Sequence, residues 1–255
     1  MNAFTPSAIA QFRTKVDSLL RQDLGMPSDR AEGFTQFAEA LLFDNPDQAL
    51  AQIAQKMEST GIRTKWNRVL WETRSKFIAE WIAPYIVGAL LDLLCGHGGI
   101  SEFLSHYGIE VTLSEREGIY PEDWKLPNLP YISLSDLIAM PPAHYFDTVV
   151  LSTVLHHESD PEVLLSVAGR LAKRRIIIVE NCLESDYPPD FQLLMDIFFN
   201  HCLNLTDLES PAVHRSIEGW LSSVSSYGKI YHIERRENIP GIPLSHQLIV
   251  IDVNS

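Results

Sequence analysis

Residues Asp92 to Glu115 combine a glycine-rich turn with two carboxylates, at a spacing that suits a nucleotide-like ligand. A short apolar run, 89–91, leads into Asp92, and Gly96 and Gly98 follow it. Glycine lets backbone approach a ligand where a Cβ would clash. Glu115 follows Asp92 by 23 residues (115 − 92 = 23), close to the roughly 20 residues that precede the ribose carboxylate in βαβ nucleotide-binding units. The pattern predicts strand, turn, helix and second strand around such a ligand.

A second polar cluster follows an apolar strand pattern at 146–152 and ends with His156 and His157. Neighbouring residues on a helix point about 100° apart, so at most one of these imidazoles is expected to face a ligand. An imidazole titrates near neutral pH and suits a general base. We therefore predict His156 or His157 as the residue that removes a proton, unless proximity and orientation suffice. Further candidates for this role are His201, and then His214 and His246.

At these two clusters the chain resembles the small-molecule class I S-adenosylmethionine-dependent methyltransferases. The family pattern Asp/Glu-x-Gly-x-Gly-x-Gly stands here as Asp92-Leu93-Leu94-Cys95-Gly96-His97-Gly98, with Leu94 replacing the first glycine. Many members also carry a stretch of Phe-Asp, an apolar strand and then Leu-His-His or Glu-His, which is similar to residues 146–157 here. A dinucleotide-binding G-x-G-x-x-G is incomplete here, because Ser101 stands at its last glycine.

The resemblance implies S-adenosyl-L-methionine as cofactor and S-adenosyl-L-homocysteine as product. Asp92 would face the amino end of the cofactor, Glu115 would bind the ribose hydroxyls and Asp136 would meet the adenine amino group. The alternative for Asp136 is an N-cap of a short helix. Ser152 and Thr153 are expected beside the sulfonium. The predicted cofactor-binding residues are Asp92, Cys95, Gly96, His97, Gly98, Glu115, Asp136, Leu137, Ser152 and Thr153.

Residues that follow the fifth predicted strand are candidates for contact with the substrate. Ligands of parallel sheets bind beyond the carboxyl ends of the strands, and aromatic side chains suit an apolar pocket, although each alone suits a core equally well. In-line methyl transfer requires no metal, and the sequence shows no metal-ligand cluster. The predicted substrate-binding residues are Trp66, Trp71, Glu180, Asn181 and Phe198.

Strand and helix patterns alternate over 89–253, which predicts a doubly wound α/β sheet. By the resemblance it should have seven mostly parallel strands and a C-terminal antiparallel strand. Residues 1–88 show only helical periodicity, and an apolar helix pattern lies within 182–216. We predict both as a lid over the substrate, attached to a methyltransferase domain at 89–255; plain packing is the alternative. The strand candidates are 89–93, 109–114, 130–133, 146–152, 174–180, 229–235 and 246–253.

Composition narrows the cellular context. The chain has 255 residues and a net charge of −13, from 20 Lys and Arg against 33 Asp and Glu. This balance disfavours nucleic acid as a partner, since phosphate binding relies on Lys and Arg. Three cysteines without a C-x-x-C motif indicate a reducing compartment and no zinc site. No secretory signal and no run of membrane-spanning length are present. We expect a cytoplasmic protein with a small-molecule substrate; the oligomeric state stays open.

The predicted reaction is methyl transfer to an oxygen or nitrogen atom of a small, apolar or ring-containing metabolite. The large, rather apolar lid favours natural-product tailoring. One alternative is C- or O-methylation of a quinone or lipid precursor. Another is a non-catalytic methyltransferase-like binding protein in which Leu94 marks lost cofactor binding. Ser152-Thr153-Val154-Leu155 stands where Asn-Pro-Pro-Tyr accompanies methylation of adenine N6 or glutamine, so these targets are disfavoured.

Overall fold

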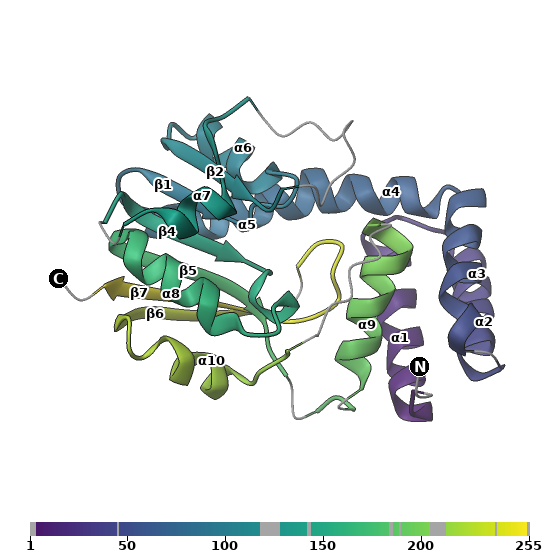
Figure 1. The fold of residues 1–255 in the computed structure, drawn as a ribbon. Coiled ribbons are helices and arrows are strands. Elements are labelled where there is room, and N and C mark those ends of the chain that lie inside the picture. Colours follow the sequence, from purple (N-terminus) through teal and green to yellow (C-terminus); the bar gives the residue numbers. More distant parts are fainter. Residues whose placement is uncertain are drawn as a thin grey trace. The chain divides into compact units, whose positions relative to one another are not determined.

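The computed structural model describes residues 4–44, 46–117, 128–141, 144–183, 186–188, 190–204, 213–237 and 239–253. The chain divides into two compact units (Figure 1). We call residues 1–74, 183–214 and 238–244 the helical unit. Residues 75–182, 215–237 and 245–255 form the sheet unit.

The sheet unit is built on a seven-stranded sheet in the order β3-β2-β1-β4-β5-β7-β6 (Figure 1). Neighbours from β3 to β5 pair in parallel, whereas β7 pairs antiparallel with both β5 and β6. The predicted fold class is confirmed, including the antiparallel C-terminal strand. The strands are β1 Leu90–Leu93, β2 Val111–Glu115, β3 Tyr131–Ser133, β4 Phe146–Ser152, β5 Ala172–Asn181, β6 Gly228–Arg236 and β7 His246–Val253.

The strand order reverses between β1 and β4, which makes the carboxyl ends of these two strands the switch point. Ligands of open α/β sheets bind there, because the chain leaves the two strands toward opposite faces. The central strands are buried on both faces and are therefore almost wholly apolar, as in Ile176 to Val179 of β5. The polar residues that end these strands thus stand out as candidates for function.

Helices cover both faces of the sheet. On one face α7 (Leu134–Ala139), α8 (Pro161–Leu171) and α10 (Ile217–Val224) share a core with inward residues of the strands. Behind the sheet in Figure 1, α5 (Ser75–Ile82) and α6 (Gly99–His106) pack against each other. Two single turns, Ala83–Tyr85 and Leu155–His157, precede β1 and follow β4 respectively.

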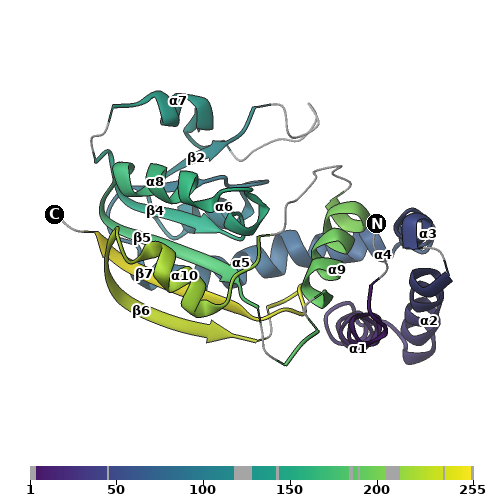
Figure 2. The same cartoon turned by 60° about the horizontal axis from the view of Figure 1, so that its bottom comes forward.

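The helical unit has its own core, shared between its N-terminal helices and the insertion after β5. Phe198 lies 5.1 Å from Phe12 and 5.6 Å from Trp66, measured between ring centroids. Figure 2 shows α9 with the N-terminal helices. The elements are α1 Pro6–Gln22, α2 Ser28–Asp44, α3 Pro46–Ser59, α4 Ile62–Arg68, the π-helical Val69–Arg74, α9 Phe191–Phe198 and the π-helical Phe199–Asn204.

Apart from shifts of one or two residues at the ends of the insertion, the units differ from the predicted division at two places. Residues 75–88 belong to the sheet unit, because α5 packs against α6. Residues 238–244, between β6 and β7, belong to the helical unit. There the Trp66 Nε1–H donates to the Gly241 carbonyl at 2.7 Å, and the Gly241 N–H donates to the Asp23 carboxylate at 2.8 Å. The role of the helical unit as a lid stays a prediction.

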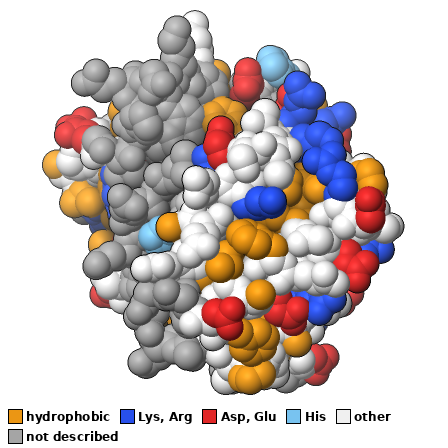
Figure 3. All heavy atoms as spheres, turned by 90° about the vertical axis from the view of Figure 1, so that its right-hand side faces the viewer, with side chains coloured by type: hydrophobic (Ala, Val, Ile, Leu, Met, Phe, Trp, Pro, Cys, Tyr) orange, Lys and Arg blue, Asp and Glu red, His pale blue; other side chains and the backbone are white. Residues whose placement is uncertain are grey.

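The surface over α1, α2 and α3 has a mixed character. Figure 3 shows charged side chains of both signs among apolar ones on this face. Such a mixture is common on solvent-facing protein surfaces. Among the residues that the structure describes, no helix is both long and apolar enough to cross a membrane.

Candidate active site

The turn after β1 is left-handed at three positions. Leu94, Gly96 and Gly98 have φ of 60°, 58° and 75°, and the Cys95 N–H donates to the Ser114 carbonyl at 2.9 Å. Glycine adopts positive φ without strain, whereas a residue with a Cβ pays roughly 1–2 kcal/mol. The turn therefore forms although Leu94 replaces the first glycine of the motif. Leu94 is buried in the core of the sheet unit, and that burial offsets its strain.

Two substitutions at Leu94 should separate strain from packing. Leu94→Ala removes the buried side chain but keeps the strained φ, and should lower the free energy of unfolding by about 2–5 kcal/mol. Leu94→Gly removes the same contacts and relaxes the backbone, so it should be more stable than Leu94→Ala by about 1 kcal/mol. Denaturant unfolding of the two variants measures the difference. Equal or reversed stabilities would contradict strain at this position.

Glu115, at the end of β2, is bonded to the turn through its carboxylate. One oxygen accepts from the Gly96 N–H at 2.8 Å, and the other accepts from the Arg116 N–H at 2.8 Å. Burial raises the pKa of Glu115, and the two backbone hydrogen bonds oppose that rise. Each carboxylate oxygen can accept a further hydrogen bond. Glu115 thus fixes the turn and can still receive ligand hydroxyls.

Asp92, in β1, is a second buried carboxylate near the carboxyl ends of the strands. Its Oδ2 accepts from the Ser101 hydroxyl on α6 at 2.6 Å. Burial raises the pKa of Asp92 to about 6; the Ser101 hydrogen bond opposes this rise and the charge of Glu115 adds to it. Such an acid is ready to stabilise a cationic ligand group. In the sequence Ser101 was used only to argue against a dinucleotide motif; its contact with Asp92 was not predicted, because the hydroxyl and the carboxylate come from different elements.

The other predicted residues of the turn and of α7 make local contacts. His97 Nδ1 accepts from the Gly99 N–H at 3.1 Å, where α6 begins. Burial raises the pKa of the Cys95 thiol, so this thiol stays protonated. Asp136 is not the N-cap of α7: that residue is Ser133, whose hydroxyl accepts from the Asp136 N–H at 3.1 Å and donates to the Asp136 carboxylate at 2.7 Å. Leu137 is fully buried.

Buried polar atoms gather at the carboxyl ends of β2, β4 and β5. Among the described residues, Ser114 Oγ, Ser152 Oγ and Asn181 Oδ1 have no hydrogen-bond partner. A buried polar atom left in this state costs about 1–3 kcal/mol. Three such atoms at the carboxyl ends of the strands suit a ligand that supplies their hydrogen-bond partners.

Thr153, directly after β4, has a strained backbone. Its φ is 55°, which is an outlier for a β-branched residue and costs about 1–3 kcal/mol. Its N–H donates to the Val179 carbonyl at 2.7 Å, so β5 holds the strained turn in place. Strain of this kind clusters at functional sites, and here it lies at the switch point.

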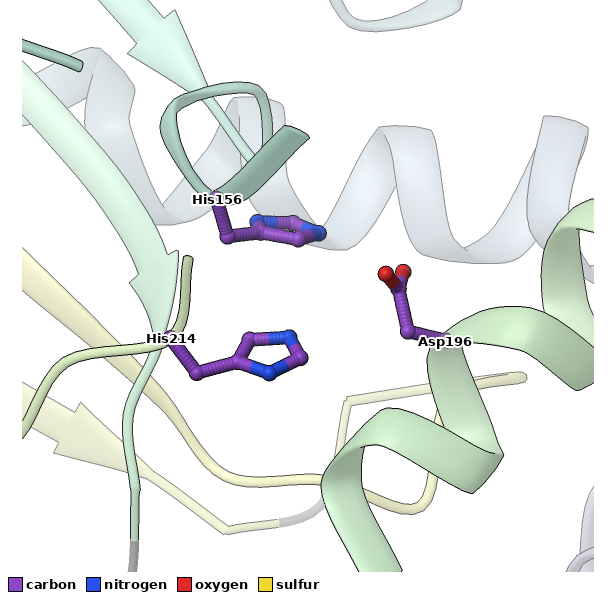
Figure 4. A group of neighbouring side chains, drawn as sticks. All are labelled: His156, Asp196 and His214. Carbon is purple, nitrogen blue, oxygen red and sulfur yellow. The ribbon is translucent and has the colours of Figure 1, made fainter. Parts of the chain in front are cut away.

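The structure distinguishes the two adjacent histidines. His156 is buried, and its Nδ1 lies 2.7 Å from Glu180 Oε2. His157 is half-buried, and its ring centroid lies 4.0 Å from that of His156. Figure 4 shows His156 on the single turn after β4. Burial raises the pKa of Glu180. Attraction to His156 and hydrogen bonds from His156 and the Leu155 N–H lower it by more than burial raises it, so the pKa lies below its usual range.

An ion pair connects the strand ends on either side of β1. Arg116, after β2, pairs with Glu158, which follows the single turn after β4. Because β1 lies between β2 and β4 in the sheet, this pair links the two flanks of the glycine turn. Neither residue was singled out in the sequence, where a charge just after an apolar strand is commonplace.

The predicted residues of the helical unit occupy different environments. Trp66 and Phe198 are fully buried in its core, Trp71 is 37 % exposed and His201 is exposed. Asp196 on α9 and His214 also belong to this unit, and their carboxylate and imidazole atoms lie within 4.8 Å of each other (Figure 4). His246 is buried in β7 of the sheet unit. The assignments of Trp66, Trp71, Phe198 and His201 to substrate binding or catalysis stay predictions.

No protein-family model and no curated protein matches this sequence. Solved structures do match. Magnesium protoporphyrin IX methyltransferase ChlM from Synechocystis PCC 6803, with bound SAH, is 16% identical with a TM-score of 0.51, covering 80% of this chain and 99% of that one. The 1,6-didemethyltoxoflavin-N1-methyltransferase of Burkholderia thailandensis is 12% identical with a TM-score of 0.51, covering 80% and 89%.

The [4+2]-cyclase SpnF also matches, at 12% identity and a TM-score of 0.51, covering 70% of this chain and 80% of that one. Proteins with different reactions thus share this architecture, and the reaction must be argued from the site. The strand order, the glycine turn and these structural matches agree: the chain has the fold of the class I S-adenosylmethionine-dependent methyltransferases.

Proposed function

We propose that the protein transfers a methyl group from S-adenosylmethionine to an oxygen or nitrogen atom of a small, apolar or ring-containing metabolite. The observation that carries the proposal is the left-handed turn after β1, held to the buried Glu115 carboxylate at the switch point. Two structurally similar proteins are named as methyltransferases of ring compounds, and both were solved with SAH bound. Natural-product tailoring in the cytoplasm is the setting that we propose.

The residues at this edge of the sheet fit the cofactor. The buried Asp92 carboxylate suits the cationic amino end, and the open acceptor sites of Glu115 suit ribose hydroxyls. Ser152, whose hydroxyl lacks a partner among the described residues, suits a polar cofactor atom. Asp136 remains our candidate for the adenine amino group. When bound, the cofactor supplies an electrophilic methyl carbon.

The chain's own contribution is to orient the acceptor, exclude water and receive a proton. We assign proton removal to His156, because a buried imidazole held by a carboxylate is a suitable general base. Holding donor and acceptor in line supplies the rest of the rate enhancement. The non-catalytic alternative rested on Leu94, but the turn keeps its left-handed form there, which favours a working cofactor site.

A labelled methyl donor tests the proposed function. The protein is incubated with S-adenosylmethionine that carries an isotopic label in the methyl group, together with a panel of phenols, aromatic amines and a small-metabolite extract. Mass spectrometry should detect S-adenosylhomocysteine and a labelled small molecule in equal amounts. A chain that produces no S-adenosylhomocysteine above a protein-free control, with any of these acceptors, would contradict methyl transfer.

Cofactor affinity should depend on pH through Asp92. The pKa of this acid is raised from 3.8 to about 6 in the folded protein, so it is mostly protonated below that value. A cationic ligand group favours the carboxylate, so binding lowers this pKa and releases a proton. Affinity should therefore fall as pH drops through about 6. Calorimetry at pH 5.5 in buffers of different ionisation enthalpy measures the proton release, which should disappear in Asp92→Asn.

A further inference from the structure

The helix α9 presents two faces of different character. Its apolar face, which includes Phe191 and Leu194, packs into the core of the helical unit. Gln192 and Asp196 share another face, because residues four apart lie on one side of a helix, and both are only 5 % exposed. Asn200, in the π-helical segment that follows α9, is 6 % exposed. We call Gln192, Asp196 and Asn200 the polar stripe.

Gln192 is the member of the polar stripe whose burial is least compensated. Its Nε2 is buried and has no hydrogen-bond partner among the residues that the structure describes. A buried amide without a partner destabilises the folded chain, whereas an apolar side chain of similar length at the same place would not. Polar groups that are kept at such a cost are expected where a ligand supplies the missing partner.

Asp196 adds a hydrogen-bond acceptor one turn further along α9. Its carboxylate lies within 4.8 Å of the His214 imidazole, which belongs to the same unit (Figure 4). A carboxylate offers about four acceptor sites on its two oxygens, so a neighbouring imidazole leaves sites for a ligand. The Cβ atoms of Gln192 and Asp196 are about 5–6 Å apart at this spacing, and the two side chains can therefore contact one small molecule.

We propose that the polar stripe binds the methyl acceptor and selects a cyclic amide, in which a ring carries a carbonyl oxygen beside an N–H group. This inference rests on the proposed methyl transfer and narrows its substrate class. The NH₂ group of Gln192 donates to the carbonyl oxygen, and the Asp196 carboxylate accepts from the N–H. A ring compound that lacks either group is rejected, because a buried partner then stays unpaired. The π-helical segment directly after α9 agrees with this role, since such segments are frequent at functional sites.

A purely structural role for the polar stripe is the competing explanation, and the stability of the ligand-free protein separates the two. Gln192→Met replaces the buried amide by an apolar side chain of similar length. The midpoint of thermal unfolding should rise, because the cost of the unpartnered amide is removed. Leu193→Ala is the control on the same helix, since Leu193 is 37 % exposed, and it should change the midpoint little. A midpoint of Gln192→Met that equals or lies below that of the wild type would overturn the proposal.

Three two-ring compounds of similar shape test the choice of ligand by calorimetric titration. Hydrocarbostyril carries both the carbonyl oxygen and the N–H group, N-methylhydrocarbostyril lacks the N–H, and tetrahydroquinoline lacks the carbonyl oxygen. The wild type should bind hydrocarbostyril at least about tenfold more tightly than either analogue. Asp196→Leu should lose the preference over the N-methyl compound, and Gln192→Met should lose the preference over tetrahydroquinoline. Each variant thus reports on the ligand group that its residue contacts.

The affinity for S-adenosylmethionine, measured on the same preparations, should stay unchanged in these variants, and Leu193→Ala should bind all three compounds as the wild type does. A wild type that binds hydrocarbostyril no more tightly than its analogues would overturn the polar stripe as a substrate site, even if labelled methyl transfer is observed. Variants that keep the preferences of the wild type would overturn it as well. Selective binding of hydrocarbostyril by a protein that produces no S-adenosylhomocysteine supports the site and counts against the proposed methyl transfer instead.

Discussion

Replacing His156 by alanine should lower the rate of methyl transfer by about 10²–10⁴-fold and leave the affinity for S-adenosylmethionine unchanged. His156 is the buried member of the histidine pair and lies 2.7 Å from the Glu180 carboxylate. Loss of the imidazole removes the proton acceptor but none of the carboxylates that we assign to the cofactor. Turnover is measured with saturating labelled donor, and affinity by calorimetry on the same preparation.

His157→Ala and His201→Ala are the matched controls for this prediction. The first removes the imidazole next in the chain, and the second removes an exposed one on the π-helical segment after α9. Both should stay within a few-fold of wild type. If His156→Ala also stays within a few-fold, no histidine base operates at this turn. Catalysis would then rest on proximity and orientation, as for an amine acceptor that loses its proton before it binds.

Replacing Glu115 by alanine should weaken S-adenosylmethionine binding by roughly 1.5–3 kcal/mol, which is the range for a hydrogen bond to a charged group. The substitution removes the proposed acceptor of the ribose hydroxyls. It also deprives the Gly96 N–H of its partner at 2.8 Å, so the turn loses its anchor. Both effects act in the same direction. Calorimetric titration of the folded variant gives the affinity.

Glu102→Ala provides the control for charge. This acid is exposed on the first turn of α6 and lies close in sequence to the glycine turn. Its removal changes the net charge by the same amount without touching the proposed site. Unchanged affinity in a folded Glu115→Ala variant would reject the ribose assignment. An equal loss in Glu102→Ala would attribute the effect to long-range charge instead.

The architecture of the sheet unit was predictable because its signals are local. Apolar runs such as that of β5, broken by polar residues at the strand ends, mark each strand without reference to the rest of the chain. The glycine turn was predictable for the same reason, because Gly96 and Gly98 are visible in the sequence and both occupy positions with positive φ. The division of the helices between the two units differs from the predicted boundaries. Periodicity identifies the helix face that is buried, but it does not identify the partner against which that face packs.

Several site contacts lay beyond sequence reasoning because they join distant residues. Ser101 bonds Asp92, and Glu180 bonds His156 across the pairing of β4 with β5. Glu180 was predicted as a substrate contact, which stays a prediction, and its carboxylate accepts from the Leu155 N–H in the turn after β4. Such contacts depend on the strand register and on the strained backbone of Thr153. Neither the register nor the strain can be predicted from a single sequence.

The most direct test of the account is a calorimetric titration of the wild-type protein with S-adenosylmethionine and S-adenosylhomocysteine, with NAD as the comparison ligand. The account predicts saturable binding of both sulfur ligands at one site per chain and no measurable binding of NAD, because the turn after β1 lacks the last glycine of a dinucleotide motif. Saturable binding of NAD, or no binding of either sulfur ligand to folded protein, would contradict it.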